Sequence, residues 1–143
     1  MSEKLEFMLL ALESSRRALP VCRPNPPVGC VIVHKGKVVS KGFTKSPGHY
    51  HAEIDAISKL TLPIGECEIF VTLEPCSFQG RTPSCALTLA ELKPQHIYVA
   101  LEDPHPRNRG EGLSILKNAG INYTLGIGKK EVEDFLLSYL IRS

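Results

Sequence analysis

The segment EIFVTLEPCSFQGRTPSCALTLAEL, residues 68–92, decides the fold that we expect. Its β-branched and apolar start predicts a buried strand over Glu68–Leu73. A Thr-Pro pair further along is typical of a helix start, and we expect a helix over Ser84–Leu92. The segment therefore places two cysteines, Cys76 and Cys85, at junctions where a strand ends or a helix begins.

The rest of the chain repeats this alternation of strand and helix. Hydrophobic periodicity and turn residues predict helices over residues 3–18, 50–60, 112–119 and 132–140, and strands over 28–34, 37–43, 95–101 and 121–125. The first two strands are joined by a short Lys-Gly connection that suits a hairpin. We therefore expect an α/β fold, with a mixed sheet packed between helices.

The composition is that of one globular domain that binds a small molecule. With 143 residues, 43% of them hydrophobic, the chain can bury its own core. A net charge of +2 and 6% aromatic residues argue against a nucleic-acid partner, which requires basic channels and stacking surfaces. The apolar run Phe7–Leu12 is too short for a membrane span or a signal sequence. We expect a cytoplasmic protein with no nucleic-acid or membrane partner.

Three residues of metal-ligand type lie at loop-to-helix junctions: His51, Cys76 and Cys85. Five cysteines without an export signal favour thiols or a metal site over disulfides. Helix N-termini lower the pKa of nearby thiols, so we expect both cysteines to be thiolates. One imidazole and two thiolates leave a tetrahedral zinc ion one open position for water, as in catalytic sites. We predict one zinc ion per chain at these residues.

Glu53 is the candidate for general acid and base. Glu53 lies two residues after His51. On a helix this spacing points the two side chains to different faces, which argues against Glu53 as a further ligand of the same metal ion. A carboxylate there can take a proton from water and hand it to a substrate nitrogen. His-x-Glu followed by Pro-Cys-x-x-Cys is the zinc-deaminase pattern, although here eight residues separate Cys76 from Cys85. An isolated His-x-Glu is more often a solvated helix face, but the two cysteines favour the zinc site.

Other residues have both an ordinary and a functional interpretation. Asn25 lies between prolines and is either a turn residue or a substrate contact. His49 is either a loop residue or part of the pocket wall. Guanidinium groups suit phosphate oxygens, so Arg81, Arg107 and Arg109 are candidates for a phosphate cradle, although exposed loop arginines are common.

The remaining cysteines and histidines have ordinary roles. We expect Cys30 to be a small core residue and Cys22 and Cys67 to be loop thiols. His34 and His96 flank strands and are expected at the surface.

Four stretches carry a resemblance to a known family: PNPPVGCVIV (24–33), HAEIDAI (51–57), VTLEPCSFQGRTPSCALTL (71–89) and DPHPRNRGEGLSILKNAGI (103–121). Together they resemble the deaminase domain of the bifunctional riboflavin-biosynthesis deaminase/reductase, within the cytidine-deaminase-like superfamily. The resemblance covers nearly the whole chain. The TLEPC segment and the eight-residue gap between the two cysteines distinguish this family from tRNA adenosine deaminases and cytidine deaminases.

The resemblance implies a three-layer α/β/α sandwich with a mixed five-stranded sheet. It implies a hydrolase that deaminates an amino-substituted pyrimidine ribosyl phosphate in riboflavin biosynthesis. The zinc ligands would be His51, Cys76 and Cys85, with Glu53 as the proton shuttle. The substrate pocket that it implies includes Asn25, the loop around Arg81 and the loop of Asp103.

The chain departs from this family at three positions that face or flank the substrate. Thr44 and Phe78 stand where the family usually carries histidine, and His105 stands where it carries asparagine. These departures leave the chemistry in place and keep a second substrate class open, namely a pterin, a purine or another aminated heterocycle. A non-catalytic binding module with zinc is the third interpretation, which the presence of Glu53 disfavours.

The resemblance also bears on domains and partners. We expect residues 1–143 to form a single zinc-dependent deaminase domain, without the reductase domain of the family. A small-molecule substrate is the expected partner. A homo-oligomer and a separate reductase are the two further partners left open.

Overall fold

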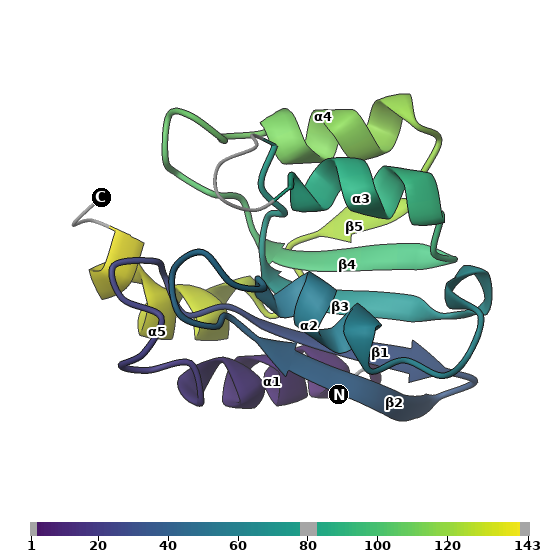
Figure 1. Cartoon of the computed structure of the whole chain (residues 1–143), viewed down its shortest axis with the longest axis horizontal. Helices are drawn as coiled ribbons and strands as arrows, with labels where there is room; N and C mark the ends of the chain where they lie inside the picture. The colour runs from purple at the N-terminus through teal and green to yellow at the C-terminus, as the bar shows by residue number, and fades with distance from the viewer. Residues whose placement is uncertain (1–2, 78–82, 141–143) are drawn as a thin grey trace.

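A five-stranded sheet lies at the centre of the computed structural model, which describes residues 3–77 and 83–140 (Figure 1). The strand order is β2-β1-β3-β4-β5. The strands are β1 (Gly29–His34), β2 (Lys37–Phe43), β3 (Glu68–Leu73), β4 (His96–Leu101) and β5 (Tyr123–Leu125). β1 is antiparallel to both β2 and β3, whereas β3, β4 and β5 run parallel. The mixed sheet predicted from the sequence is confirmed.

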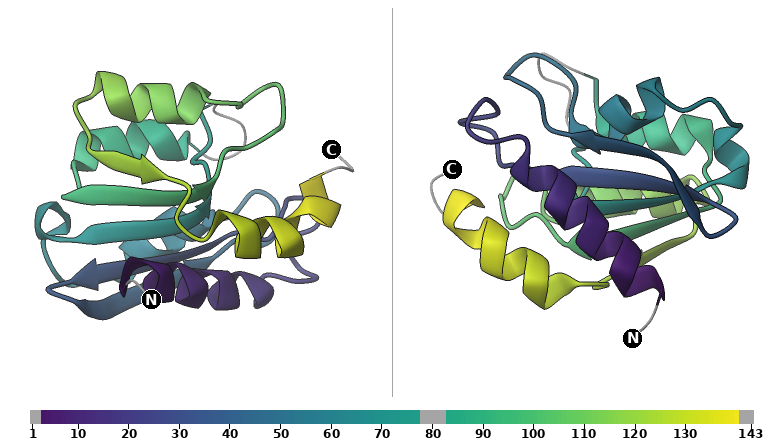
Figure 2. Two further views of the ribbon diagram at one scale, coloured as in Figure 1. Left: turned by 180° about the vertical axis from the view of Figure 1, so that it is seen from behind. Right: turned by 90° about the horizontal axis from the view of Figure 1, so that it is seen from below.

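Helices cover both faces of this sheet (Figure 2). On one face lie α1 (Glu3–Arg16) and α5 (Lys129–Leu140). On the other lie α2 (Ala52–Ser58), α3 (Cys85–Leu92) and α4 (Glu111–Asn118), and a single 3-10 turn, Ile64–Glu66, precedes β3. The fold is therefore the three-layer α/β/α sandwich that the resemblance implies.

Each face of the sheet has its own hydrophobic core. Successive strand residues point to opposite faces, so Phe70 packs toward α1 and α5 while Val71 packs toward the three other helices. The Phe70 ring stacks on Tyr98 with a centroid separation of 4.5 Å. Because β3 and β4 are covered on both faces, their sequences are nearly continuous apolar runs.

Two glycines allow helices to approach the β1–β2 hairpin closely. A Cβ atom at Gly29 would lie 1.8 Å from the carbonyl oxygen of Ala11 in α1. A Cβ atom at Gly42 would lie 2.3 Å from the carbonyl oxygen of Ala52 in α2. Since a backbone carbonyl cannot move aside alone, any larger residue at either position must displace a helix.

The carboxyl ends of β3 and β4 meet at one edge of the sheet, because the two strands are parallel. The backbone N–H of Glu74, just after β3, donates to the carbonyl of Leu101 at the end of β4, at 2.9 Å. The segments that follow the two strands therefore start side by side.

Two helix boundaries differ from those expected and define the site. α2 begins at Ala52, so His51 is not inside the helix but is its N-cap residue, with an extended backbone at φ −77° and ψ 170°. α3 begins at Cys85, and its cap is Ser84, whose hydroxyl accepts a hydrogen bond from the Leu87 N–H at 3.2 Å. Thr82, which with Pro83 forms the Thr-Pro pair that marked the expected helix start, lies outside the described residues.

The other cysteines and histidines largely follow expectation. Cys30 lies in the core, and Cys22 and Cys67 lie in loops, where both are buried. His34 and His96 are half-buried instead of fully at the surface, and His96 Nε2 hydrogen-bonds the Thr124 hydroxyl at 2.8 Å.

None of the helices in residues 3–77 and 83–140 combines the length and the apolar character that a membrane crossing requires.

We predict that Gly29→Ala lowers the free energy of unfolding by about 1–3 kcal/mol or more, because the new methyl group overlaps the Ala11 carbonyl. Gly65→Ala is the matched control, since its Cβ would meet nothing closer than 3.8 Å. Urea denaturation followed by circular dichroism measures both. Equal stability of the two variants would contradict the close approach of α1 to β1.

Candidate active site

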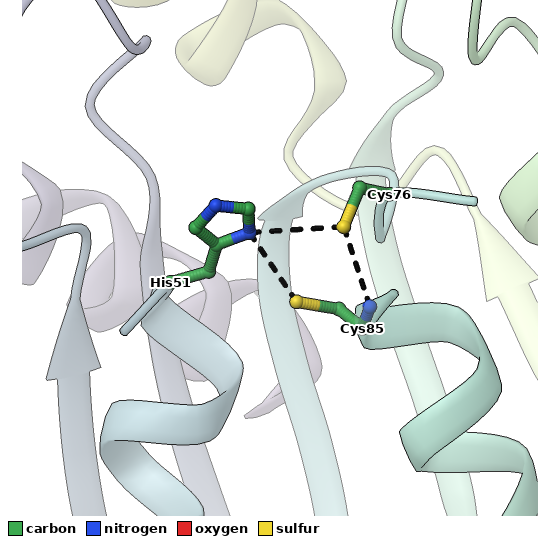
Figure 3. Close-up of side chains that lie close together, drawn as sticks. All are labelled: His51, Cys76 and Cys85. Atoms are coloured by element: carbon green, nitrogen blue, oxygen red, sulfur yellow. Dashed lines mark hydrogen bonds between the residues drawn. The ribbon is translucent and has the colours of Figure 1, made fainter. Parts of the chain in front are cut away.

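His51, Cys76 and Cys85 converge at the carboxyl edge of the sheet, each from a different element (Figure 3). His51 caps α2, Cys76 follows β3, and Cys85 is the first residue of α3. His51 Nδ1 lies 3.7 Å from Cys76 Sγ and 3.4 Å from Cys85 Sγ. The structure thus brings together the three residues that the sequence singled out as metal ligands.

The spacing of these three atoms fits a zinc ion. Zinc–sulfur bonds of about 2.3 Å and zinc–nitrogen bonds of about 2.0–2.1 Å, at tetrahedral angles, separate nitrogen from sulfur by about 3.6 Å. The observed separations are 3.7 and 3.4 Å. Imidazole and thiolate are also the donors that zinc prefers. The cluster therefore has both the size and the donor chemistry of a three-residue zinc site.

The two thiols differ in their protonation. Hydrogen bonds from Cys85 and His51, opposed by burial, lower the pKa of Cys76 to about 4. The Cys85 backbone N–H also donates to Cys76 Sγ, at 3.3 Å. The hydrogen bond to Cys76, together with burial, raises the pKa of Cys85 well above its usual value. In the metal-free chain a second negative charge beside Cys76 is therefore disfavoured, and the expectation of two thiolates on a zinc ion stays a prediction.

Glu53 lies in the first turn of α2 and is 3% exposed. Burial raises the pKa of Glu53 to about 7, against the opposing attraction of His51. The residue faces a cavity of about 440 Å³ that His51 and Cys76 also line. A carboxyl group with a pKa near neutrality, beside a cavity, is suited to both taking and giving a proton.

Three of the predicted substrate contacts line this cavity: Asn25, Thr44 and Asp103. The Thr44 hydroxyl accepts a hydrogen bond from the Val28 N–H at 3.0 Å and lies 3.4 Å from the Val28 carbonyl. Asp103 Oδ1 accepts from the backbone N–H of His105 at 3.0 Å. Thr44 is thus held to the protein backbone, so its hydroxyl is less free to serve a ligand.

The other predicted contacts lie elsewhere. His49 is exposed and lines a second cavity, of about 800 Å³, which also touches His51 and Cys85. Phe78 and Arg81 lie outside the described residues. Arg107 and Arg109 are exposed, and Arg109 contacts the Pro104 carbonyl at 3.5 Å. The phosphate cradle therefore stays a prediction.

The sequence reasoning missed two buried polar residues, Glu74 and Asn108. The Glu74 carboxylate accepts hydrogen bonds from three backbone N–H groups, those of Asp103 at 3.1 Å, Gly110 at 3.0 Å and Leu113 at 3.1 Å. Burial raises the pKa of Glu74, and the three N–H donors partly offset this. The one signal for Glu74 in the sequence was an acidic residue directly after a buried strand.

Comparison with known proteins agrees with this geometry. The family described as the cytidine and deoxycytidylate deaminase zinc-binding region matches residues 1–101. The chain belongs to this family. Among solved structures, the RibD protein of Acinetobacter baumannii superimposes with a TM-score of 0.92 at 37% identity, covering 97% of this chain and 39% of that one.

Two further relatives point the same way. The riboflavin biosynthesis protein RibD of Chlamydia pneumoniae is 39% identical over 138 residues, which is 96% of this chain and 37% of that protein. A deaminase/reductase of Thermotoga maritima superimposes with a TM-score of 0.89 at 31% identity, over 98% of this chain and 42% of that one. The resemblance drawn from the sequence is confirmed, and the chain spans about two fifths of these relatives.

We predict that Glu74→Gln lowers the free energy of unfolding by about 1–3 kcal/mol, because the amide nitrogen must face a backbone N–H and leave that donor unpaired. Amide exchange at Gly110 and Leu113 should accelerate. Glu91→Gln, on the exposed surface of α3, is the control and should leave both measurements unchanged. Unaltered exchange in Glu74→Gln would show that the carboxylate does not hold this segment.

Proposed function

We propose that the chain is a zinc-dependent hydrolytic deaminase acting on an amino-substituted pyrimidine that carries a ribosyl phosphate, as in riboflavin biosynthesis. The observation that carries the proposal is the position of buried Glu53 beside the His51, Cys76 and Cys85 cluster, at the wall of one cavity. The Thermotoga maritima relative, 31% identical, is described as a diaminohydroxyphosphoribosylaminopyrimidine deaminase and a uracil reductase. Its deaminase name supplies the substrate class.

A zinc ion in such a site supplies a water nucleophile at neutral pH, because it lowers the pKa of water. Glu53 would take a proton from that water and deliver it to the ring nitrogen next to the amino-bearing carbon. The water oxygen would bond that carbon as the ring nitrogen gains the proton. Glu53 would then move the second proton of the water to the amino group, the carbon–nitrogen bond would break, and ammonia would leave while the carbon keeps the oxygen as a carbonyl. The Glu53 pKa of about 7 suits this repeated transfer, since neither the acid nor the base form is strongly favoured at neutral pH.

The other predicted substrate contacts are proposed to divide the remaining roles among themselves. Asn25 and Asp103, both at the wall beside Glu53, are proposed to hydrogen-bond the pyrimidine ring. Arg81 is proposed to bind the phosphate, because guanidinium groups suit phosphate oxygens. Phe78 would offer an apolar face to the ring.

A second candidate function keeps this chemistry and changes the substrate to another aminated heterocycle, such as a pterin or a purine. The hydroxyl of Thr44 favours it, because its contacts with the Val28 backbone leave it less able to replace the histidine that the resemblance expects. Burial of a polar substrate group without a hydrogen-bond partner weakens binding by about 1–3 kcal/mol of free energy. A non-catalytic zinc module gains no support, since such a module needs no buried carboxyl at the cavity wall.

We also propose that these residues make up one deaminase domain of a cytoplasmic protein. A reductase on a separate chain and a homo-oligomer stay predictions.

We predict near-stoichiometric zinc in the purified protein, one ion per chain, and a sharp loss of zinc in Cys85→Ser, because a hydroxyl is a poor replacement for a thiolate ligand. Cys67→Ser is the matched control, since Cys67 is buried but its thiol bonds the Pro63 carbonyl instead of facing the cluster. Metal analysis by mass spectrometry measures all three proteins. Full zinc retention in Cys85→Ser would refute the ligand assignment.

We predict that Glu53→Gln keeps its zinc and its fold but loses about 10²–10⁴-fold in ammonia release, since an amide cannot accept and return a proton. The assay uses aminopyrimidine, pterin and purine substrates, each with and without a ribosyl phosphate. Glu66→Gln, at an exposed position, is the control. A loss below about tenfold would exclude Glu53 as the shuttle, and turnover of only a pterin or a purine would select the second candidate.

A further inference from the structure

We propose that Asn108 is a positioning residue that fixes Cys76 in the metal cluster and ties it to Asp103 in the cavity wall. Asn108 lies just before α4, 32 positions away from Cys76 in the sequence, and is 1% exposed. The proposal rests on the zinc site proposed above and assigns to it a residue outside the ligand set and outside the cavity lining.

The carboxamide of Asn108 bonds the backbone on both sides of Cys76. Its Oδ1 accepts a hydrogen bond from the Ser77 N–H at 2.9 Å. Its Nδ2 donates to the Pro75 carbonyl at 3.3 Å. These bonds fix the peptide groups that precede and follow Cys76, and therefore the direction in which the Cys76 side chain leaves the backbone.

The other side of this backbone is held by α3. The Cys76 carbonyl accepts from the Ser84 hydroxyl at 2.8 Å and from the Ala86 N–H at 3.0 Å. Since α3 also carries Cys85, these bonds set the distance between the two thiols. Asn108 anchors the segment from the side of α4, so that Cys76 is held between two helices and cannot turn away from His51.

Asn108 also reaches the cavity wall. Its Nδ2 lies 3.3 Å from Asp103 Oδ2, to which it donates, and the other carboxylate oxygen of Asp103 accepts from the backbone of its own loop. Asp103 is thus oriented by a residue whose second function is to hold a metal ligand. One buried carboxamide couples the position of the metal to that of the proposed ring contact.

The packing of α4 leaves the backbone around Cys76 little room to adopt another conformation. A Cβ atom at Gly112 would lie 2.0 Å from the Pro75 carbonyl oxygen, so α4 packs directly against the segment that carries Cys76. Glu74, the residue before Pro75, also holds the N-terminus of α4. Loss of the Asn108 amide therefore leaves a Ser77 donor and a Pro75 acceptor without partners in a space too small for large rearrangement.

The test compares Asn108→Leu, which keeps the side-chain volume and removes all of these hydrogen bonds, with Leu116→Ala. Leu116 is a fully buried residue of α4, the helix that follows Asn108, and its truncation weakens the fold without touching the cluster. Zinc affinity is measured on the folded proteins by competition with a chelator. Replacement of zinc by Co²⁺ gives a visible absorption spectrum that reports the geometry of the thiolate ligands.

We expect Asn108→Leu to bind zinc about 10–100-fold more weakly than the parent chain, the range typical for outer partners of metal ligands, with an altered Co²⁺ spectrum. Leu116→Ala should keep the parent affinity and spectrum. The inference is overturned if Asn108→Leu binds zinc within about threefold of the parent, or if Leu116→Ala weakens zinc to the same degree. A parent chain that binds no zinc would instead refute the proposed function.

A second variant covers failure of Asn108→Leu to fold. Asn108→Asp keeps the acceptor for the Ser77 N–H, loses both donated bonds and places a carboxylate oxygen against Asp103 and the Pro75 carbonyl, so its zinc affinity should fall by at least about threefold. Affinity equal to that of the parent chain would overturn the inference.

Discussion

The three hydrogen bonds that the Glu74 carboxylate accepts from backbone N–H groups hold together the two segments on which the site depends. Parallel pairing brings the ends of β3 and β4 to one edge, but pairing stops where the strands stop. Beyond that point both segments are irregular, and their buried backbone groups need other partners. Glu74 supplies these partners two residues before Cys76, so it also constrains the backbone that leads to that thiol.

The cluster itself sets a second constraint, which is electrostatic. An imidazole, two thiols and Glu53 lie in a largely buried space where four independent charges would be unfavourable. In the metal-free chain, hydrogen bonds from Cys85 and His51 lower the pKa of Cys76, the hydrogen bond to Cys76 raises the pKa of Cys85, and burial raises the pKa of Glu53. A divalent cation would favour both thiolates at once and displace these protons, so metal binding to the proposed site should depend on pH.

Much of the fold and of the candidate site could be predicted from the sequence, because the signals that decide them are local. Hydrophobic runs and turn residues predicted the strands and the layers, and the junctions predicted where His51, Cys76 and Cys85 would meet. The hydrogen bond between Gly110 and Glu74 joins residues 36 positions apart, and that between Ser77 and Asn108 joins residues 31 positions apart. No local sequence pattern predicts such contacts. The cap of α3 was misplaced for a similar reason, since Ser84 is fixed by the Cys76 carbonyl as well as by its own helix.

Most of the residues proposed for the chemistry lie in helices or at their ends, whereas those predicted substrate contacts that the structure describes lie in loops. Glu53 and Cys85 lie in α2 and α3 and His51 caps α2, whereas Cys76 lies in the short segment that follows β3. Asn25, Thr44 and Asp103 lie in the segments before β1, after β2 and after β4, where a substitution disturbs no strand pairing. Such segments can change while the reacting groups stay in place. The departures at Thr44 and His105 both fall in such segments. Under the proposed function, these two departures would affect the choice of substrate more than the reacting groups.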